Sequence, residues 1–268
     1  MKIVVIMSVY KNDKLMLLQE ALNSLYAQTY KEADIFVQCD GELPYELDEY
    51  LEKEYLYNRI KLLNKRSDNK GLAYSLNELV LEGISRKYDY FVRMDADDIC
   101  DPDRFFQQFS FMESNKKCDV VGSDIVEFYE DGSERLIAYH ASHEKIRSNF
   151  STKTAIPHVS AFFRRSFFEK SGLYNIESNQ NEDQWLWLNG FLNGCIFASI
   201  PHALVRVRVS LNLLKRRGDF KHNLDTFKLR NRIVSLLKFN KVYYLYNILV
   251  FCVKMQPPWL LKIIYKLR

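Results

Sequence analysis

Apolar and polar residues alternate along the first hundred positions in blocks that predict strands and helices in turn. Near-continuous apolar runs rich in β-branched residues predict strands buried on both faces over 2–9, 34–38, 60–64 and 88–94. The segments between them predict helices over 14–28, 45–57 and 72–84, the first of them capped by Asp13. Four strands that alternate with three helices predict an α/β fold with a doubly wound, largely parallel sheet and helices on both faces.

The second half of the chain predicts a less regular series of elements. We expect strands over 120–128, 157–165 and 203–209, with a turn at Asp131-Gly132 that leads into a further strand. We expect helices over 102–115, 144–150 and 181–194. No internal repeat or low-complexity linker interrupts this pattern.

Polar residues follow each of the four strands predicted in the first half. In doubly wound sheets a ligand binds beyond the carboxyl ends of the strands. We therefore expect one edge to gather Ser8, Val9 and Tyr10, then Asp40 and Gly41, then 66–71, and finally Asp95, Ala96, Asp97 and Asp98. The last group places three carboxylates within four residues, and these repel one another unless a cation joins them. An acidic turn would explain the group equally well on its own, and its place at the ligand edge favours a site.

Two common phosphate-binding motifs are absent from the sequence. No GxGxxG follows the first strand, and no GxxxxGK[ST] occurs. A nucleotide would therefore need its phosphates neutralised in another way. Carboxylate oxygens suit Mg²⁺ or Mn²⁺, and these ions usually also hold a substrate phosphate.

Several short motifs, in a fixed order, resemble those of family 2 glycosyltransferases with the GT-A nucleotide-diphospho-sugar transferase fold. They are Ser8-Val9-Tyr10, Asp40, Asn69-Lys70-Gly71-Leu72-Ala73, Met94-Asp95-Ala96-Asp97-Asp98 and Glu182-Asp183-Gln184-Trp185. The stretch from Arg206 to Gly218 is similar to a narrower branch, the bacterial exopolysaccharide and O-antigen transferases of the amylovoran-biosynthesis type. The resemblance extends from about Lys2 to Gly218.

This resemblance implies transfer of one sugar from a UDP-sugar donor to an acceptor hydroxyl, with Mn²⁺ or Mg²⁺ as cofactor. The donor site would comprise Ser8, Val9, Tyr10, Asp40, Asn69, Gly71, Asp95, Ala96 and Asp97. Within it, Asp40 would accept a hydrogen bond from the base. Asp97 would ligate the metal, with Asp95 beside it near the ribose, and Asp98 would support this site.

An acidic pair at the start of a predicted helix would supply the catalytic base. The acceptor hydroxyl loses a proton as it attacks the anomeric carbon, so a carboxylate must lie within reach. The resemblance assigns that role to Asp183, with Glu182 beside it, and the helix dipole would hold the base ionised at neutral pH. Taken alone, the pair is more typical of an ordinary helix N-terminus than of a catalytic base, and the ordered set of motifs favours the base. One base and one metal site fit an inverting single displacement, and no Q-x-x-R-W signature of the processive branches follows.

Two further residues are candidates for contacts with acceptor or phosphate. His158 lies where this family often has a histidine, although a structural histidine fits the pattern equally well. Trp185 would stack on a sugar face, and core packing is its alternative role. Arg206-Val207-Arg208 stands where many relatives have Arg-x-His, which argues against a histidine metal ligand there.

Charge divides the chain into two predicted regions. The net charge is +4, yet residues 215–268 carry thirteen Lys and Arg against two acids, so the residues before them carry −7. We therefore expect a glycosyltransferase domain over 1–214 and a basic, aromatic-rich helical extension over 215–268. Basic amphipathic helices bind anionic membrane surfaces, and the apolar run 242–253 is shorter than the roughly 20 residues that span a bilayer. The alternatives are a helical cap on the catalytic domain or attraction of the acceptor's diphosphate.

The resemblance implies an enzyme of bacterial surface-polysaccharide synthesis, making O-antigen, capsule or exopolysaccharide. Its acceptor would be a lipid-diphosphate-linked saccharide, and we expect no nucleic-acid partner. Five cysteines without a CxxC pair and the absence of a secretory signal favour a cytoplasmic location, peripheral on the inner face of the membrane. Two alternatives are a nucleotidyltransferase, whose usual glycine-rich loop is missing, and a non-enzymatic basic module that binds membrane or nucleic acid, which leaves the acidic body unexplained.

Overall fold

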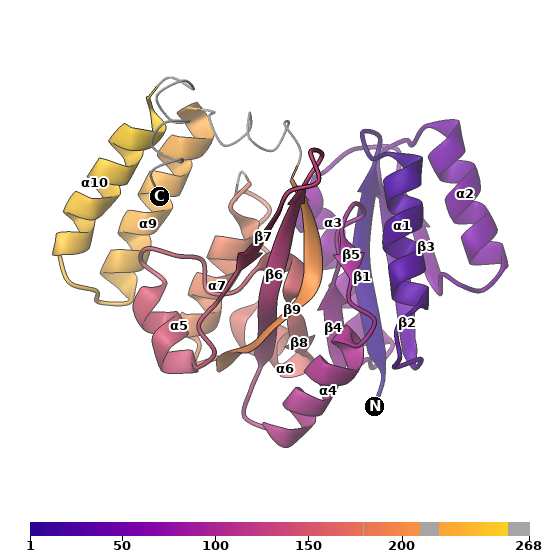
Figure 1. Ribbon diagram of the computed structural model, residues 1–268, viewed down its shortest axis with the longest axis horizontal. Coiled ribbons are helices and arrows are strands. Elements are labelled where there is room, and N and C mark those ends of the chain that lie inside the picture. Colours follow the sequence, from indigo (N-terminus) through magenta and orange to yellow (C-terminus); the bar gives the residue numbers. More distant parts are fainter. Residues whose placement is uncertain (179, 210–219, 257–268) are drawn as a thin grey trace.

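A mixed β-sheet runs through the body of the molecule (Figure 1). The computed structural model describes residues 1–178, 180–209 and 220–256. Within these ranges nine strands form one sheet in the order β3-β2-β1-β4-β8-β6-β9-β5, and β7 pairs with β6. The strands are β1 (Ile3–Tyr10), β2 (Ala33–Asp40), β3 (Leu62–Lys65), β4 (Tyr90–Arg93), β5 (Ile99–Cys100), β6 (Val120–Tyr129), β7 (Glu134–Ile137), β8 (Phe162–Arg164) and β9 (Phe197–Val209).

Helices cover both faces of this sheet. They are α1 (Leu15–Tyr26), α2 (Tyr45–Leu56), α3 (Leu72–Ser85), α4 (Arg104–Ser114), α5 (His143–Asn149), α6 (Arg165–Ser171), α7 (Glu182–Leu192), α9 (Phe220–Leu236) and α10 (Val242–Lys254), with a 3₁₀ turn, η1, at His158–Ser160. Leu18 of α1, Leu51 of α2 and Phe105 of α4 belong to the apolar core on one face. α3, α6 and α7 contribute to a second core on the other face.

The first four strands pair as the sequence predicts. β1 is parallel to both β2 and β4, and β2 is parallel to β3. The register pairs Val9 with Cys39 and Ile6 with Arg93, so the carboxyl ends of these strands lie side by side. The polar residues that follow the strands therefore share one edge of the sheet.

The second half departs from the predicted elements in several places. The strand expected over 157–165 is only three residues long, because the chain first makes the η1 turn, closed by a Ser160 N–H bond to the Pro157 carbonyl at 3.1 Å. The helix α6 follows at once and was not predicted. The final strand starts at Phe197 rather than at residue 203. Asp13 does not cap α1, because its carboxylate instead accepts the backbone N–H of Tyr10 at 2.9 Å.

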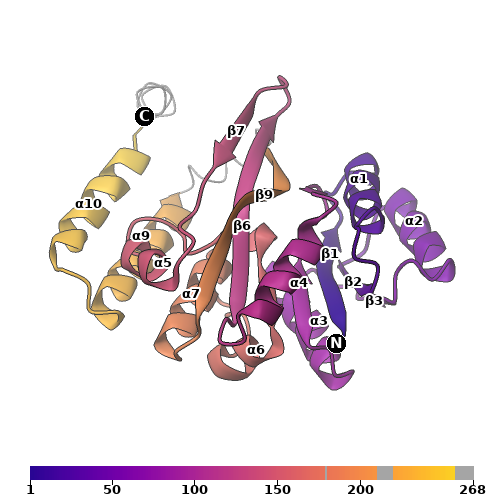
Figure 2. The same cartoon turned by 60° about the horizontal axis from the view of Figure 1, so that its bottom comes forward.

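The two C-terminal helices lie side by side at the end of the molecule opposite α1 and α2 (Figures 1 and 2). α9 packs on the body through Leu229 and Ile233, which belong to the second core. The predicted boundary between 214 and 215, and most of the segment Arg206 to Gly218, lie at or within 210–219, outside the described residues. In the described parts of the chain, every helix is too short or too polar to cross a bilayer.

Candidate active site

A cavity of about 710 Å³ opens at the carboxyl ends of β1, β2 and β4, where α7, β9 and α9 also reach it. Most of the predicted site residues line it: Ser8, Tyr10, Asp40, Asn69, Gly71, Asp95, Ala96, Asp97, Asp98 and Glu182. They come from sequence positions that are up to 174 residues apart and meet because the parallel strands end together. The structure therefore has a cavity at the edge of the sheet where the strand order predicted a ligand site.

Val9, Asp183, Trp185 and His158 do not line the cavity. The Val9 side chain points to the opposite face of β1 and is fully buried in the core. Trp185 is half-buried, with the guanidinium carbon of Arg232 at 5.0 Å from its ring centroid. His158 Nε2 lies 2.9 Å from the Tyr174 hydroxyl, and burial lowers the pKa of this histidine well below its usual value. The imidazole is thus held neutral behind the cavity wall.

The carboxylates of Asp95, Asp97 and Asp98 approach one another closely enough for oxygens of all three to lie within 4.8 Å. Asp98 is turned towards β9, where its Oδ1 accepts the Arg208 N–H at 2.8 Å. Burial and the nearby Asp95 raise the pKa of Asp97 to about 6. This concentration of negative charge, carried on hard oxygen donors, fits a Mg²⁺ or Mn²⁺ ion.

Asp13 adds a fourth carboxylate to this wall of the cavity, although the sequence suggested only a helix cap for it. Burial raises the pKa of Asp13 to about 7, against the lowering effect of the Tyr10 N–H, and Asp97 and Asp95 raise it further. The only signal in the sequence was its place after the first predicted strand. Asp13 thus faces the same part of the cavity as the Asp95–Asp98 cluster.

Arg93 is a buried cation between the two groups of acids. Its guanidinium forms an ion pair with Asp95 and lines the same cavity as Glu182. Its positive charge opposes the rise in the pKa of Glu182 and of Asp183. A lone arginine in the otherwise apolar run 90–94 was the signal that could have revealed it.

Asp40 holds the loop that carries Asn69 and Gly71. Its carboxylate accepts the backbone N–H groups of Lys70 at 2.8 Å and Gly71 at 2.9 Å, and it also pairs with Arg66. Gly71 has φ of +87°, a conformation that a side chain would strain. Asp40 was expected to accept a hydrogen bond from the nucleotide base. In this structure its carboxylate holds the loop 66–71 in place.

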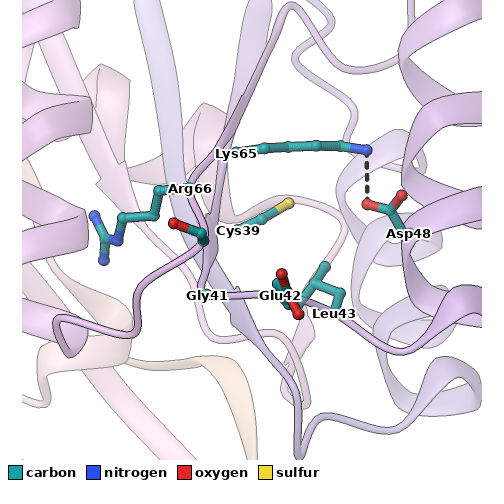
Figure 3. A pocket seen from close by; sticks show the side chains of 8 residues that line it. Cys39, Gly41, Glu42, Leu43, Asp48, Lys65 and Arg66 are labelled. Carbon is teal, nitrogen blue, oxygen red and sulfur yellow. Dashed lines mark ion pairs between the residues drawn. The ribbon is translucent and has the colours of Figure 1, made fainter.

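A second hollow of about 410 Å³ lies on the other side of Arg66, between β3 and α2 (Figure 3). Its cation, Lys65, is bound by Asp48 at 2.6 Å and Glu52 at 2.5 Å. Figure 3 shows Arg66 pointing away from Lys65. With Lys65 already neutralised, this hollow is a poorer phosphate site than the larger cavity.

The acidic pair lies in the first turn of α7, as predicted. Glu182 faces the cavity, and Asp183 Oδ2 accepts a hydrogen bond from Gln184 Nε2 at 3.1 Å. Burial raises the pKa of both carboxyls, and the Gln184 hydrogen bond opposes the rise at Asp183. Burial therefore outweighs the helix dipole, and a raised pKa makes a carboxylate a stronger base once it is ionised.

The family of the chain follows from comparison with known proteins. The model of the family described as Glycosyl transferase family 2 matches residues 4–172. The chain belongs to this family. It is a glycosyltransferase, and its sheet with flanking helices is the GT-A fold that the sequence predicts.

Several relatives of this glycosyltransferase have names that describe their activity. The amylovoran biosynthesis glycosyltransferase AmsE of Erwinia amylovora is 33% identical over 218 residues, which cover 80% of this chain and 79% of AmsE. The Escherichia coli UDP-Gal:alpha-D-GlcNAc-diphosphoundecaprenol beta-1,3-galactosyltransferase is 29% identical over 229 residues, 85% of this chain and 81% of that enzyme. Among solved structures, the mannosyltransferase PcManGT of Pyrobaculum calidifontis, in complex with GDP-Man and Mn²⁺, matches with a TM-score of 0.67 at 14% identity, over 99% of this chain and 79% of that one.

Proposed function

We propose that this glycosyltransferase moves one sugar from a UDP-sugar to a hydroxyl of a lipid-diphosphate-linked saccharide in the synthesis of a bacterial surface polysaccharide. The observation that carries the proposal is the position of Arg93. Its guanidinium pairs with Asp95 and lines one cavity with the Asp95–Asp98 cluster and Glu182. Its charge also opposes the rise in the pKa of Glu182 and of the neighbouring Asp183. A relative that acts on a diphosphoundecaprenol-linked sugar with UDP-Gal supports the donor and acceptor classes.

In this proposal Asp97 and Asp95 hold a Mn²⁺ or Mg²⁺ ion, and Asp98 holds their loop against β9 through Arg208. When bound, the ion would neutralise the donor diphosphate and stabilise the charge of the leaving group. The loop anchored by Asp40, together with Ser8 and Tyr10, would line the nucleoside.

Asp183 accepts the proton of the acceptor hydroxyl as that oxygen attacks the anomeric carbon. Glu182 lies beside it and faces the donor cavity. The acceptor oxygen attacks from the side of the base, and the nucleoside diphosphate leaves from the opposite side of the sugar. This single displacement inverts the configuration at the anomeric carbon. One sugar is transferred in each encounter.

We further propose that the enzyme works as a peripheral protein on the inner face of the cytoplasmic membrane, where a lipid-linked acceptor would lie. His158 and Trp185 do not line the cavity. Of the two, Trp185 is the better candidate for an acceptor contact, because His158 is occupied by Tyr174.

The donor half of the proposal is tested by thermal unfolding. UDP with Mn²⁺ should raise the melting temperature more than UDP with EDTA, and more than GDP or CDP with Mn²⁺. A larger shift with GDP would change the donor class, and a shift with nucleoside triphosphates alone would favour a nucleotidyltransferase.

The acceptor half is tested by a transfer assay with a synthetic lipid-diphosphate N-acetylglucosamine. Separate reactions contain UDP-linked galactose, glucose, N-acetylgalactosamine or N-acetylglucosamine, and the anomeric configuration of the product is read by NMR. Retention of configuration would refute the single displacement. Transfer to a free sugar as efficient as to the lipid-linked one would refute the acceptor class.

A further inference from the structure

The helix α10 has a different environment from α9, although the sequence suggested one continuous basic extension. α9 buries Leu229 and Ile233 in the core of the catalytic body. α10 packs on α9, with Phe251 against Phe227 at 5.2 Å between ring centroids and Asn247 Nδ2 donating to Asn231 Oδ1 at 2.9 Å. α9 is therefore the helical cap that the sequence allowed, and α10 lies outside it (Figures 1 and 2).

The outer face of α10 is apolar and exposed. Val242 is 56% exposed, Leu245 69%, Ile248 48% and Leu249 62%. Their spacing places them on one side of the helix, and no charged residue occurs from 242 to 253. Large contiguous apolar patches are rare on soluble monomers and mark contact surfaces.

The positive charge of the C-terminal segment indicates which kind of partner covers the apolar face of α10. From residue 226 to the last residue, 268, the sequence contains nine Lys and Arg and no acid. In the described part, exposed Lys238 and Lys241 precede α10, and Lys254 ends it. A second copy of the chain would bring like charges together, whereas an anionic surface would meet opposite charge.

The length of α10 decides whether it would cross a bilayer or lie in the plane of its surface. Thirteen residues make a helix of about 20 Å, shorter than the hydrocarbon core that a spanning helix must cross. A short helix with one apolar face and cations at its ends lies in the plane of the interface. Lysine side chains there reach back to the headgroups.

We propose that α10 docks in the headgroup boundary of an anionic bilayer. Leu245, Ile248 and Leu249 enter the acyl region, and Lys238 and Lys241 contact the lipid phosphates. The inference deepens the proposed peripheral location by naming its contact surface. It is independent of the donor, the acceptor and the chemistry of transfer, so the two proposals can fail separately.

The test is flotation of the full chain with vesicles of phosphatidylcholine alone or with one third phosphatidylglycerol. The variant Leu245→Glu/Leu249→Glu places two acids on the apolar face. Its matched control is Leu56→Glu/Leu81→Glu, which changes leucines of α2 and α3 that are 76% and 54% exposed. All proteins are first checked for the same melting temperature and the same response to UDP with Mn²⁺.

We expect the wild type and the control to float with the anionic vesicles and not with phosphatidylcholine alone. The α10 variant should partition at least tenfold more weakly. Lys238→Gln/Lys241→Gln should also weaken binding and reduce its dependence on salt, because fewer charges meet the lipid.

Three results would overturn the proposal. One is a wild type that does not float with anionic vesicles. Another is equal flotation of the α10 variant and its control. The third is a wild-type dimer in sedimentation that Leu245→Glu/Leu249→Glu makes monomeric, since a second copy would then be the partner of α10.

Discussion

Arg93 and Asp95 form an ion pair at the junction between β4 and the acidic loop that follows it. The guanidinium is only 3% exposed, and its Nε has no hydrogen-bond partner among the described residues. A buried, incompletely bonded cation is costly to keep. Its place between the proposed metal ligands and the proposed base gives a physical reason for keeping it there.

We predict that Arg93→Met reduces transfer on the order of 100-fold, which equals about 2.7 kcal/mol of barrier. Asp95 would lose the partner that orients it, and the acids of the cavity would repel one another without the central cation. Arg93→Lys keeps the charge but not the planar fork, so we expect it to recover part of the activity. The measurement is kcat and KM for the UDP-sugar.

Arg165→Met is the control, since Arg165 pairs with Glu169 at 3.3 Å within α6, away from the cavity. Folding is checked by thermal unfolding in all variants. Full transfer by a folded Arg93→Met enzyme would contradict the role of this arginine.

The base is tested by Asp183→Asn. We expect UDP affinity within threefold of the wild type and transfer lowered by roughly 100- to 10,000-fold, the range for loss of a general base. Burial raises the pKa of Asp183, and a base works only when ionised. The wild-type rate should therefore fall on acidification, beginning at a higher pH than for an exposed aspartate.

The profile of kcat against pH measures this acidic limb. Glu182→Gln is the comparison, because Glu182 also lies in the first turn of α7. If Glu182→Gln abolishes transfer and Asp183→Asn does not, the base is Glu182.

Asp97 and Asp98 are predicted to differ in their response to metal. Both have a raised pKa because of burial and neighbouring acids. A carboxyl whose pKa is higher in the folded than in the unfolded state destabilises the fold at pH values where it is ionised. Both Asp97→Asn and Asp98→Asn should therefore raise the melting temperature of the metal-free protein at pH 8.

With Mn²⁺ and UDP present, Asp97→Asn should lose the added thermal shift, whereas Asp98→Asn should keep most of it. An asparagine at 98 can still accept the Arg208 N–H, and Asp98 is not proposed as the metal ligand. If Asp98→Asn alone lost the thermal shift with Mn²⁺ and UDP, Asp98 would be the metal ligand and Asp97 the supporting residue.

The general position of the site could be predicted because it depends on local patterns. Apolar runs give the strands, parallel strands end together, and so Asp40 and Asp97 had to share an edge. The same reasoning placed Glu182 in the first turn of a helix. Periodicity and strand order were sufficient for these residues.

The electrostatic partners could not be predicted in this way. Asp13 turns to the Tyr10 N–H, Arg93 pairs with Asp95, and the Arg208 N–H meets Asp98 from a position 110 residues later. Each contact depends on side-chain direction or on long-range pairing of strands. A single sequence carries no signal for either.

The C-terminal extension illustrates a similar limit. Its composition indicated both a cap and a membrane surface. In the structure α9 packs on the body, and α10 leaves an apolar face exposed. Only packing distinguishes Ile233, buried against the body, from Leu249, which is 62% exposed. Both residues lie in basic, apolar-rich segments.

His158 should make the fold sensitive to acid. Burial, with a smaller effect of Arg93, lowers its pKa well below the usual value, so the folded protein does not take up the proton that the unfolded chain binds below about pH 6.5. The free energy of unfolding should therefore decrease as the pH falls below that value, and His158→Gln should remove part of the decrease. His140→Gln is the control, because His140 is exposed. Urea unfolding at pH 5.5 and 7.5 measures the difference, and an equal loss in all three proteins would show that other groups cause the acid sensitivity.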